Sequence, residues 1–246
     1  GRLPRLRILK LDHNILETIS ETAFHNSTQL QVIDLSGNKL ERLGERTFQG
    51  LGRLKLLNLS NNVLSELPDS IFERSRLRML ENVDLSRNNF ESPPLKTLQR
   101  QYFFLTSVNL SRNKLKEIPP DDSIMVNIKR LDLSFNPLTQ ETITNVLGEP
   151  KTVRELNMAG TGITHVPRLE TPFLYSLDLS YNSITELPEK IFERPTLLEV
   201  INLSHNKISD VTGSLSHVWS KLSNLQSVDL SSNPIRSIRQ GDLEGL

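Results

Sequence analysis

The side chains best suited to catalysis or metal binding are scattered along this 246-residue chain. No serine lies in a G-x-S-x-G turn, no glycine-rich loop is placed to cradle phosphate, and no pair of carboxylates suggests an enclosed acid and base. The five histidines match no zinc-binding motif, and cysteine is absent, which excludes thiolate ligands and disulfides. The sequence therefore predicts that the chain is not an enzyme and holds no metal or cofactor.

Asparagine offers the one modification that the sequence predicts, which is attachment of N-linked glycans at N-x-S/T sites. Four such sites occur, at Asn26, Asn58, Asn109 and Asn202. The last three lie in the triplet N-L-S, which the repeat described below generates whenever asparagine takes one particular slot. Asn26 lies in N-S-T, outside that constraint, and is therefore the better indication of secretion.

An alternating row of aspartate and asparagine is a second candidate for binding chemistry. It reads Asp34, Asn58, Asp84, Asn109, Asp132, Asn157, Asp178, Asn202, Asp229. On adjacent parallel strands, which lie about 4.8 Å apart, the asparagines would separate like charges that otherwise repel. Two interpretations stay open: electrostatic relief within a sheet, or a negative stripe that binds a basic partner or weakly collects calcium.

The elements that position these residues follow from an internal repeat. The template L-x-x-L-x-L-x-x-N-x-L occurs ten times at spacings of 21 to 27 residues, beginning at Leu6, Leu30, Leu54, Leu80, Leu105, Ile128, Val153, Leu174, Leu198 and Leu225. Apolar and polar residues alternate within each copy, which indicates a short strand with one buried face. Such a repeat predicts a solenoid.

The predicted fold is an α/β repeat solenoid, a horseshoe with a parallel β-sheet on its concave face and short helices or loops on its convex face. We expect residues 1–246 to form a single continuous array of about ten repeats, truncated at both ends and lacking caps. Helices are expected near residues 100, 143 and 217, with Trp219 anchoring the last one. A convex spine of stacked rings is expected from Phe24, Phe48, Phe72 and Phe192.

The asparagine of the template is predicted to be structural. It occurs where each strand turns inward, and a buried amide there can donate to and accept from the backbones of neighbouring repeats. Its positions are Asn14, Asn38, Asn62, Asn88, Asn113, Asn136, Asn182, Asn206 and Asn233. The seventh copy carries Thr161 instead, so this ladder of asparagines should be weakest there.

The residues just before the template asparagine are the best candidates for holding a partner. The preceding row of serines, expected on the concave face, offers no anchor, because binding hot spots favour aromatic residues and arginine. The partner-binding candidates are Phe135, Tyr181, Arg87, Arg112 and His205. Phe135 and Tyr181 lead this set, and the alternative that such rings only cover the edge of the sheet stays open.

Composition narrows the class of partner. Lysine plus arginine and aspartate plus glutamate number 29 each, so no net charge favours nucleic acid or a membrane surface. No apolar run approaches the roughly 20 residues of a membrane-spanning helix, and the first residues lack the apolar core of a signal peptide. We expect any targeting signal or membrane attachment to lie outside these residues.

The chain resembles the extracellular leucine-rich-repeat superfamily throughout its length, in its 24-residue period and its phenylalanine spine. More narrowly, FNPLTQETITNVLGEPKTVRELNMAGTGI and the following LYSLDLSYNSITELP are similar to arthropod photoreceptor adhesion proteins of the chaoptin type. That resemblance implies a glycosylated protein held on the outer leaflet by a lipid (GPI) anchor, joining photoreceptor membranes by like-with-like adhesion. It supplies no binding residues that can be transferred to this chain.

The expected function is cell adhesion at the extracellular face of the plasma membrane. Copies on apposed membranes would bind one another, and many modest contacts would sum by multivalency. The expected partner is thus a protein, with no nucleic acid and no small-molecule substrate. The alternatives are a receptor or co-receptor that captures a separate protein ligand, and an intracellular scaffold, against which the Asn26 site argues.

Overall fold

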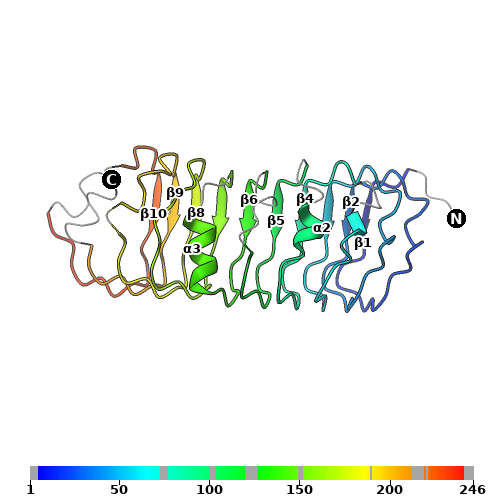
Figure 1. The fold of residues 1–246 in the computed structure, drawn as a ribbon, viewed down its shortest axis with the longest axis horizontal. Coiled ribbons are helices and arrows are strands. Elements are labelled where there is room, and N and C mark those ends of the chain that lie inside the picture. Colours follow the sequence, from blue (N-terminus) through cyan, green and yellow to red (C-terminus); the bar gives the residue numbers. More distant parts are fainter. Residues whose placement is uncertain are drawn as a thin grey trace. The chain divides into compact units, whose positions relative to one another are not determined.

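The computed structural model describes residues 5–72, 77–99, 104–119, 127–148, 152–188, 190–211, 219 and 221–240. Within them the chain forms ten three-residue strands, one in each predicted repeat. The chain divides into two compact units, the first with strands β1 to β5 and the second with β6 to β10. In each unit the strands are parallel and follow chain order, and the chain returns through loops and short helices (Figure 1).

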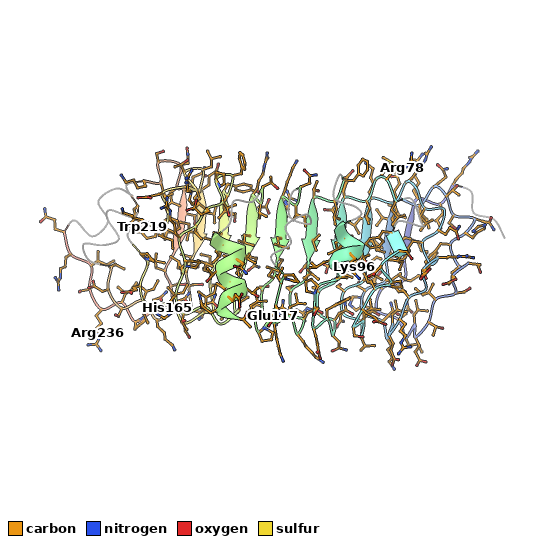
Figure 2. The ribbon with its side chains drawn as sticks, viewed as in Figure 1. Arg78, Lys96, Glu117, His165, Trp219 and Arg236 are labelled. Atoms are coloured by element: carbon orange, nitrogen blue, oxygen red, sulfur yellow. The ribbon has the colours of Figure 1, made fainter. Side chains whose placement is uncertain are left out.

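The first unit consists of β1 (Ile8–Lys10), β2 (Val32–Asp34), β3 (Leu56–Asn58), β4 (Asn82–Asp84), β5 (Ser107–Asn109) and the helix α2 (Leu95–Gln99). The strands pair in register, so the central residues Ile33, Leu57 and Val83 lie side by side and are buried. Lys96 of α2, labelled in Figure 2, forms an ion pair of 3.3 Å with Asp69 of the preceding repeat.

The second unit consists of β6 (Arg130–Asp132), β7 (Glu155–Asn157), β8 (Ser176–Asp178), β9 (Val200–Asn202), β10 (Ser227–Asp229) and the helix α3 (Gln140–Gly148). Thr139 caps α3, because its Oγ1 accepts the backbone N–H of Thr142 at 3.3 Å. The helix buries Ile143, Val146 and Leu147, so it contributes to the core of this unit.

Two of the three expected helices lie within the described residues. The one near residue 143 is α3, whereas the one near residue 100 begins earlier, at Leu95, directly after Pro93 and Pro94. Proline has a φ suited to a helix start, which explains the earlier beginning. The segment near 217 lies mostly outside the described residues. Trp219, labelled in Figure 2, is fully buried, and its ring stacks on that of Phe192 with centroids 6.1 Å apart.

The phenylalanine spine is present. The rings of Phe24 and Phe48 stack with centroids 6.3 Å apart, and Phe48 and Phe72 are 6.5 Å apart. Phe48, Phe72 and Phe192 are at most 1% exposed. Burial of each such ring stabilises a fold by roughly 1.5–3 kcal/mol, so the spine holds the returning segments to the sheet.

The template asparagines form the expected ladder, and Asn62 shows its geometry. Its Nδ2 donates to the carbonyl of Leu35 in the preceding repeat at 3.0 Å and to that of Leu59 in its own repeat at 3.1 Å. Its Oδ1 accepts the backbone N–H of Leu40 at 3.0 Å. Equivalent bonds are made by Asn38, Asn88, Asn113, Asn182, Asn206 and Asn233. These seven asparagines thereby bond their repeats, through a side-chain amide, to the repeats before them.

Thr161 replaces one member of this ladder. Its hydroxyl donates to the carbonyl of Met158 in its own repeat at 2.8 Å, and among the described residues it makes no side-chain bond to another repeat. The N–H of Leu138, which an asparagine oxygen would accept, donates to the carbonyl of Asn136 at 2.9 Å. Asn182 compensates by accepting two N–H groups, those of Thr161 and Ile163, each at 3.0 Å.

Replacing Asn62 by alanine should lower the free energy of unfolding by about 3 kcal/mol, because the buried N–H of Leu40 loses its acceptor and three carbonyls lose a donor. The exposed Asn14 bonds only to nearby carbonyls, so Asn14→Ala should change stability by less than about 0.5 kcal/mol. Urea unfolding followed by circular dichroism measures both. Equal midpoints for the two variants would contradict the role given to the ladder.

Candidate protein-binding surface

All five candidate binding residues lie in one column of the repeat, at the turn directly after each strand. We call it the turn column; it consists of His13, Gly37, Asn61, Arg87, Arg112, Phe135, Gly160, Tyr181, His205 and Ser232. Every member has a left-handed backbone, with φ between 53° and 65°. The N–H of Tyr181, for example, donates to the carbonyl of Ser204 in the next repeat at 3.0 Å, so stacking of the repeats fixes this conformation.

A left-handed backbone favours glycine, which the turn column carries twice. For other residues the conformation costs roughly 1–2 kcal/mol, and it is least common for bulky side chains. Phe135 and Tyr181 nevertheless occupy it, with φ of 54° and 55°. Their presence is therefore not explained by the backbone of the turn.

Three rings of the second unit form what we call the aromatic strip: Phe135, Tyr181 and His205. The centroids of Phe135 and Tyr181 are 6.0 Å apart, and the rings of Tyr181 and His205 stack at 4.2 Å with planes 11° apart. Phe135 is 36% exposed and Tyr181 is 54% exposed. The structure thus brings three of the candidates together on a solvent-facing surface.

Gly160 makes this contact possible. Its repeat lies between those of Phe135 and Tyr181, and a Cβ on Gly160 would lie only 2.6 Å from Cδ1 of Phe135. The Phe135 ring therefore leans across the backbone of Gly160 toward Tyr181. The glycine was not among the candidates, although its place in the same sequence column, between two aromatic residues, is a signal that could have identified it.

Arg87 and Arg112 form a second group, which we call the arginine pair. Both side chains are exposed, and both belong to the first unit, where their repeats are consecutive. Neighbouring strands lie about 4.8 Å apart, so the two side chains leave the turn column at adjacent points. The five candidates thus divide into a cationic group and an aromatic group, each within one unit.

Three neighbouring pairs of the aspartate and asparagine row are joined by hydrogen bonds between their side chains. Nδ2 of Asn109, Asn157 and Asn202 donates to Oδ2 of the aspartate in the preceding repeat, at 3.2, 3.3 and 3.2 Å. Each aspartate also accepts the N–H two residues further on, as Asp178 does from Ser180 at 2.8 Å. At Asp84, Asp132 and Asp178 the alternation therefore pairs an amide donor with a carboxylate acceptor, in addition to separating charges.

This pairing bears on the suggested calcium binding. The carboxylate oxygens are already hydrogen-bonded, and the hydroxyl and N–H of Ser231 and the nearby His205 lower the pKa of Asp229. In the part of the chain that the structure describes, no three histidine, aspartate or glutamate side chains gather as metal ligands would. The row remains a negatively charged surface beside the aromatic strip.

The serine row was expected on the solvent face, and that expectation was wrong for six of its eight serines; Ser60 is half-buried and Ser231 is exposed. Ser36, Ser86, Ser111, Ser134, Ser180 and Ser204 are all buried, with at most 8% of their surface exposed. Their carbonyls accept bonds from the ladder asparagine and from the turn column of the preceding repeat. Serine is small enough to fit into this tightly bonded turn, which accounts for its recurrence.

A charged cluster lies at the start of strands β6 to β8. The guanidinium of Arg130 donates to Oε1 of Glu155 at 2.7 Å, and the hydroxyl of Tyr175 donates to the same oxygen. The bond to Glu155 raises the pKa of both Arg130 and Tyr175. These groups neutralise one another, so the cluster presents little net charge to a ligand.

The four glycosylation candidates occupy different surroundings. Asn26 is exposed in a turn of a returning segment, where a glycan has room. Asn58, Asn109 and Asn202 end strands β3, β5 and β9 and are half-buried. The Nδ2 atoms of Asn109 and Asn202, to which a glycan would attach, are those bonded to the neighbouring aspartate. The geometry therefore favours Asn26.

Family models support the repeat assignment. Two models described as leucine-rich repeat match residues 4–64 and 172–220, and residues 224–246, which together are more than half of the chain. The chain is a leucine-rich-repeat protein. This confirms the predicted family and, with the parallel strands, the predicted fold class. Within the described residues, this leucine-rich-repeat chain has no helix long and apolar enough to cross a bilayer.

The similar curated proteins come from several kingdoms. Lumican of Rattus norvegicus is 28% identical over 240 residues, which span 96% of this chain and 60% of lumican. Tsukushi of Gallus gallus is 33% identical over 70% of this chain and 46% of its own length. Receptor like protein 22 of Arabidopsis thaliana is 32% identical over 64% of this chain and 21% of its own length. The chain thus spans between a fifth and three fifths of these relatives.

One similar protein is an enzyme, the adenylate cyclase of Schizosaccharomyces pombe. It is 33% identical over 218 residues, but the match covers only 13% of the cyclase. Such a small share carries no catalytic assignment to this chain.

Solved structures agree with the fold. A leucine-rich-repeat protein of Leptospira interrogans superposes with a TM-score of 0.78 at 30% identity, over 95% of this chain and 57% of that chain. Toll in its Drosophila complex with Spatzle gives a TM-score of 0.69 at 23% identity, over 94% of this chain and 30% of that chain, which shows the fold alone. The chain therefore has the fold of a protein-binding scaffold.

Substituting Gly160 by alanine should disrupt the aromatic strip, because the new Cβ would collide with the Phe135 ring. Gly162→Ala is the matched control: its φ of 83° is also left-handed, and a Cβ there meets nothing within 4 Å. Nuclear Overhauser contacts between the Phe135 and Tyr181 rings should persist in Gly162→Ala and be lost in Gly160→Ala. Contacts that persist in both variants would refute the role of Gly160.

Proposed function

We propose that this chain is part of an extracellular cell-adhesion protein that binds copies of itself on apposed membranes. The observation that carries the proposal is the aromatic strip, whose exposed rings stand at turn positions where glycine would be less strained. Side chains that the fold does not need, at strained positions, indicate a function. Exposed aromatic rings are the residues that most often anchor protein interfaces.

Self-binding is supported by charge. The chain has equal numbers of basic and acidic residues, so two identical copies repel little. The aromatic strip spans several repeats of a rigid array, so a docked partner would contact several residues at once. Modest contacts of this kind become strong adhesion when many copies act in parallel on two membranes.

Attachment to the outer face of the plasma membrane through a lipid anchor, and a place in photoreceptors, form the finer part of the proposal. They come from the resemblance of residues around Thr161 to adhesion proteins of the chaoptin type. The exposed position of Asn26 is compatible with a secreted glycoprotein, since a glycan there would meet no neighbouring strand.

A receptor that captures a separate protein ligand is the second candidate. It is favoured by the similarity to a protein named as receptor-like in Arabidopsis thaliana and by the fold shared with Toll, which is bound to Spatzle in its structure. The aromatic strip would serve this function equally well. The two candidates differ in whether cells that express only this protein adhere to one another.

Mixing of suspended, non-adherent cells separates the two. One population expresses the full-length protein and a dye, and the other either expresses the protein or does not. Clumps should form only between expressing cells. Clumps that include non-expressing cells, or no clumps at all, would replace self-binding by capture of a separate ligand.

Glycosylation provides a second test. Treatment of the chain, produced in animal cells, with a peptide N-glycosidase should reduce its mass. Asn26→Gln should abolish that loss, because Asn26 is exposed whereas Asn58, Asn109 and Asn202 are half-buried at strand ends, the last two with their Nδ2 atoms hydrogen-bonded. Asn109→Gln is the control and should leave the mass loss unchanged. An untreated chain with no glycan would argue for an intracellular scaffold.

A further inference from the structure

We propose that the aromatic strip of one copy docks against the arginine pair of a second copy. The proposal rests on the self-binding function proposed above and names the two surfaces that would meet. The aromatic strip is Phe135, Tyr181 and His205 in the second unit, and the arginine pair is Arg87 and Arg112 in the first unit.

The first argument is chemical complementarity within one column. Arginine guanidinium groups bind over the faces of aromatic rings at up to about 6 Å, through cation–π attraction and stacking. The turn column of the first unit ends in two consecutive arginines and contains no phenylalanine, tyrosine or tryptophan. The turn column of the second unit contains Phe135 and Tyr181 and no lysine or arginine. The turn column of the first unit thus carries the cations, and that of the second unit carries the aromatic rings that such cations bind.

The second argument is spacing. The two arginines leave adjacent repeats, whose strands lie about 4.8 Å apart. Phe135 and Tyr181 lie two repeats apart, yet their ring centroids are only 6.0 Å apart, because Phe135 leans across Gly160. The guanidinium of one arginine can therefore contact the Phe135 ring while that of the other arginine contacts the Tyr181 ring. Without the glycine, the Phe135 ring could not take the place that it has beside Tyr181.

The third argument is electrostatic. Asp178 ends strand β8 in the repeat of Tyr181, and Asp229 ends strand β10 in the repeat that follows His205 and interacts electrostatically with His205. Both carboxylates thus lie beside the aromatic strip. The hydrogen bonds from Ser231 lower the pKa of Asp229 and so favour its charged form. A cation approaching the rings is attracted by these carboxylates, whereas an arginine pair facing another arginine pair would be repelled.

Because the two surfaces differ, each contact takes the arginine pair from one copy and the aromatic strip from the other. A copy that lacks one surface still offers the other. Two variants that each lack a different surface should therefore bind one another. If the residues only stabilised the fold, mixing the two variants would not restore binding.

The experiment compares two double variants of the full-length protein on non-adherent cells. The first is Arg87→Gly with Arg112→Gly, and the second is Phe135→Gly with Tyr181→Gly. Glycine suits the left-handed backbone at all four positions, so both variants should keep the fold, which circular dichroism of the secreted chains verifies. The matched control is Asn61→Gly with Ser232→Gly, in the same column but outside both surfaces.

Cells expressing either double variant alone should clump on the order of tenfold less than wild-type cells, because every copy then lacks the same one of the two surfaces and no contact between them can form. Mixing the two variant populations should restore clumping between them, because one arginine pair and one aromatic strip then remain intact. The control variant should clump like wild type.

Wild-type clumping that neither double variant reduces would overturn the proposed surfaces and leave self-adhesion in place. Loss of clumping in both variants without restoration on mixing would also overturn them. Wild-type cells that fail to clump would instead refute self-adhesion itself, and the two failures are therefore distinguishable from the wild-type cells alone.

Discussion

The hydrogen bonds of the ladder asparagines are the interactions on which the rest of the molecule depends. A single repeat of this length buries too few apolar residues to be stable alone, and its inward turn leaves backbone groups without partners. An amide such as that of Asn62 satisfies a carbonyl in its own repeat, a carbonyl in the preceding repeat and an N–H of that preceding repeat. Because the bonds cross between repeats, they fix both the shape of each turn and the stacking of one turn on the next.

The backbone geometry of the turn column depends on this bonding. Its N–H donates to the next repeat at positions such as Arg87, Tyr181 and His205, and its left-handed backbone is the same for very different side chains. The conformation is therefore set by the repeat and not by the side chain that stands there. The side chain is consequently free to differ from one repeat to the next. The structure places histidine, glycine, asparagine, arginine, phenylalanine, tyrosine and serine on the same backbone conformation.

The sequence predicts the elements of this fold well, because the repeated positions are set by short-range geometry that recurs ten times. The strands, the ladder and the stacking of Phe24 on Phe48 all follow from spacing alone. The candidate surface was only partly predictable. Phe135, Tyr181 and His205 were found by residue type, but their mutual contact depends on how far a ring leans over a glycine in another repeat.

Two other features show why the spacing of residues in the sequence is not sufficient to predict the surface. Burial of most of the serine row was missed, because the alternation of the strand suggests a solvent-facing side chain. The chain bends inward at the end of the strand, so the side chains of Ser36 and its buried equivalents point into the protein interior. The bond from Asn109 to Asp84 was missed as well, because the sequence shows the alternation of charge and not the direction of an amide.

The uniform backbone of the turn column has a consequence for how such a protein can evolve. A substitution there alters what the surface recognises while the scaffold keeps its geometry, so specificity and stability are governed by largely separate residues. Duplication of a repeat would supply a new position of the same kind, already displayed to solvent. A lineage of these proteins could therefore diversify its binding partners by changing one residue per repeat, with the cost of each change limited to the strain at a single φ angle.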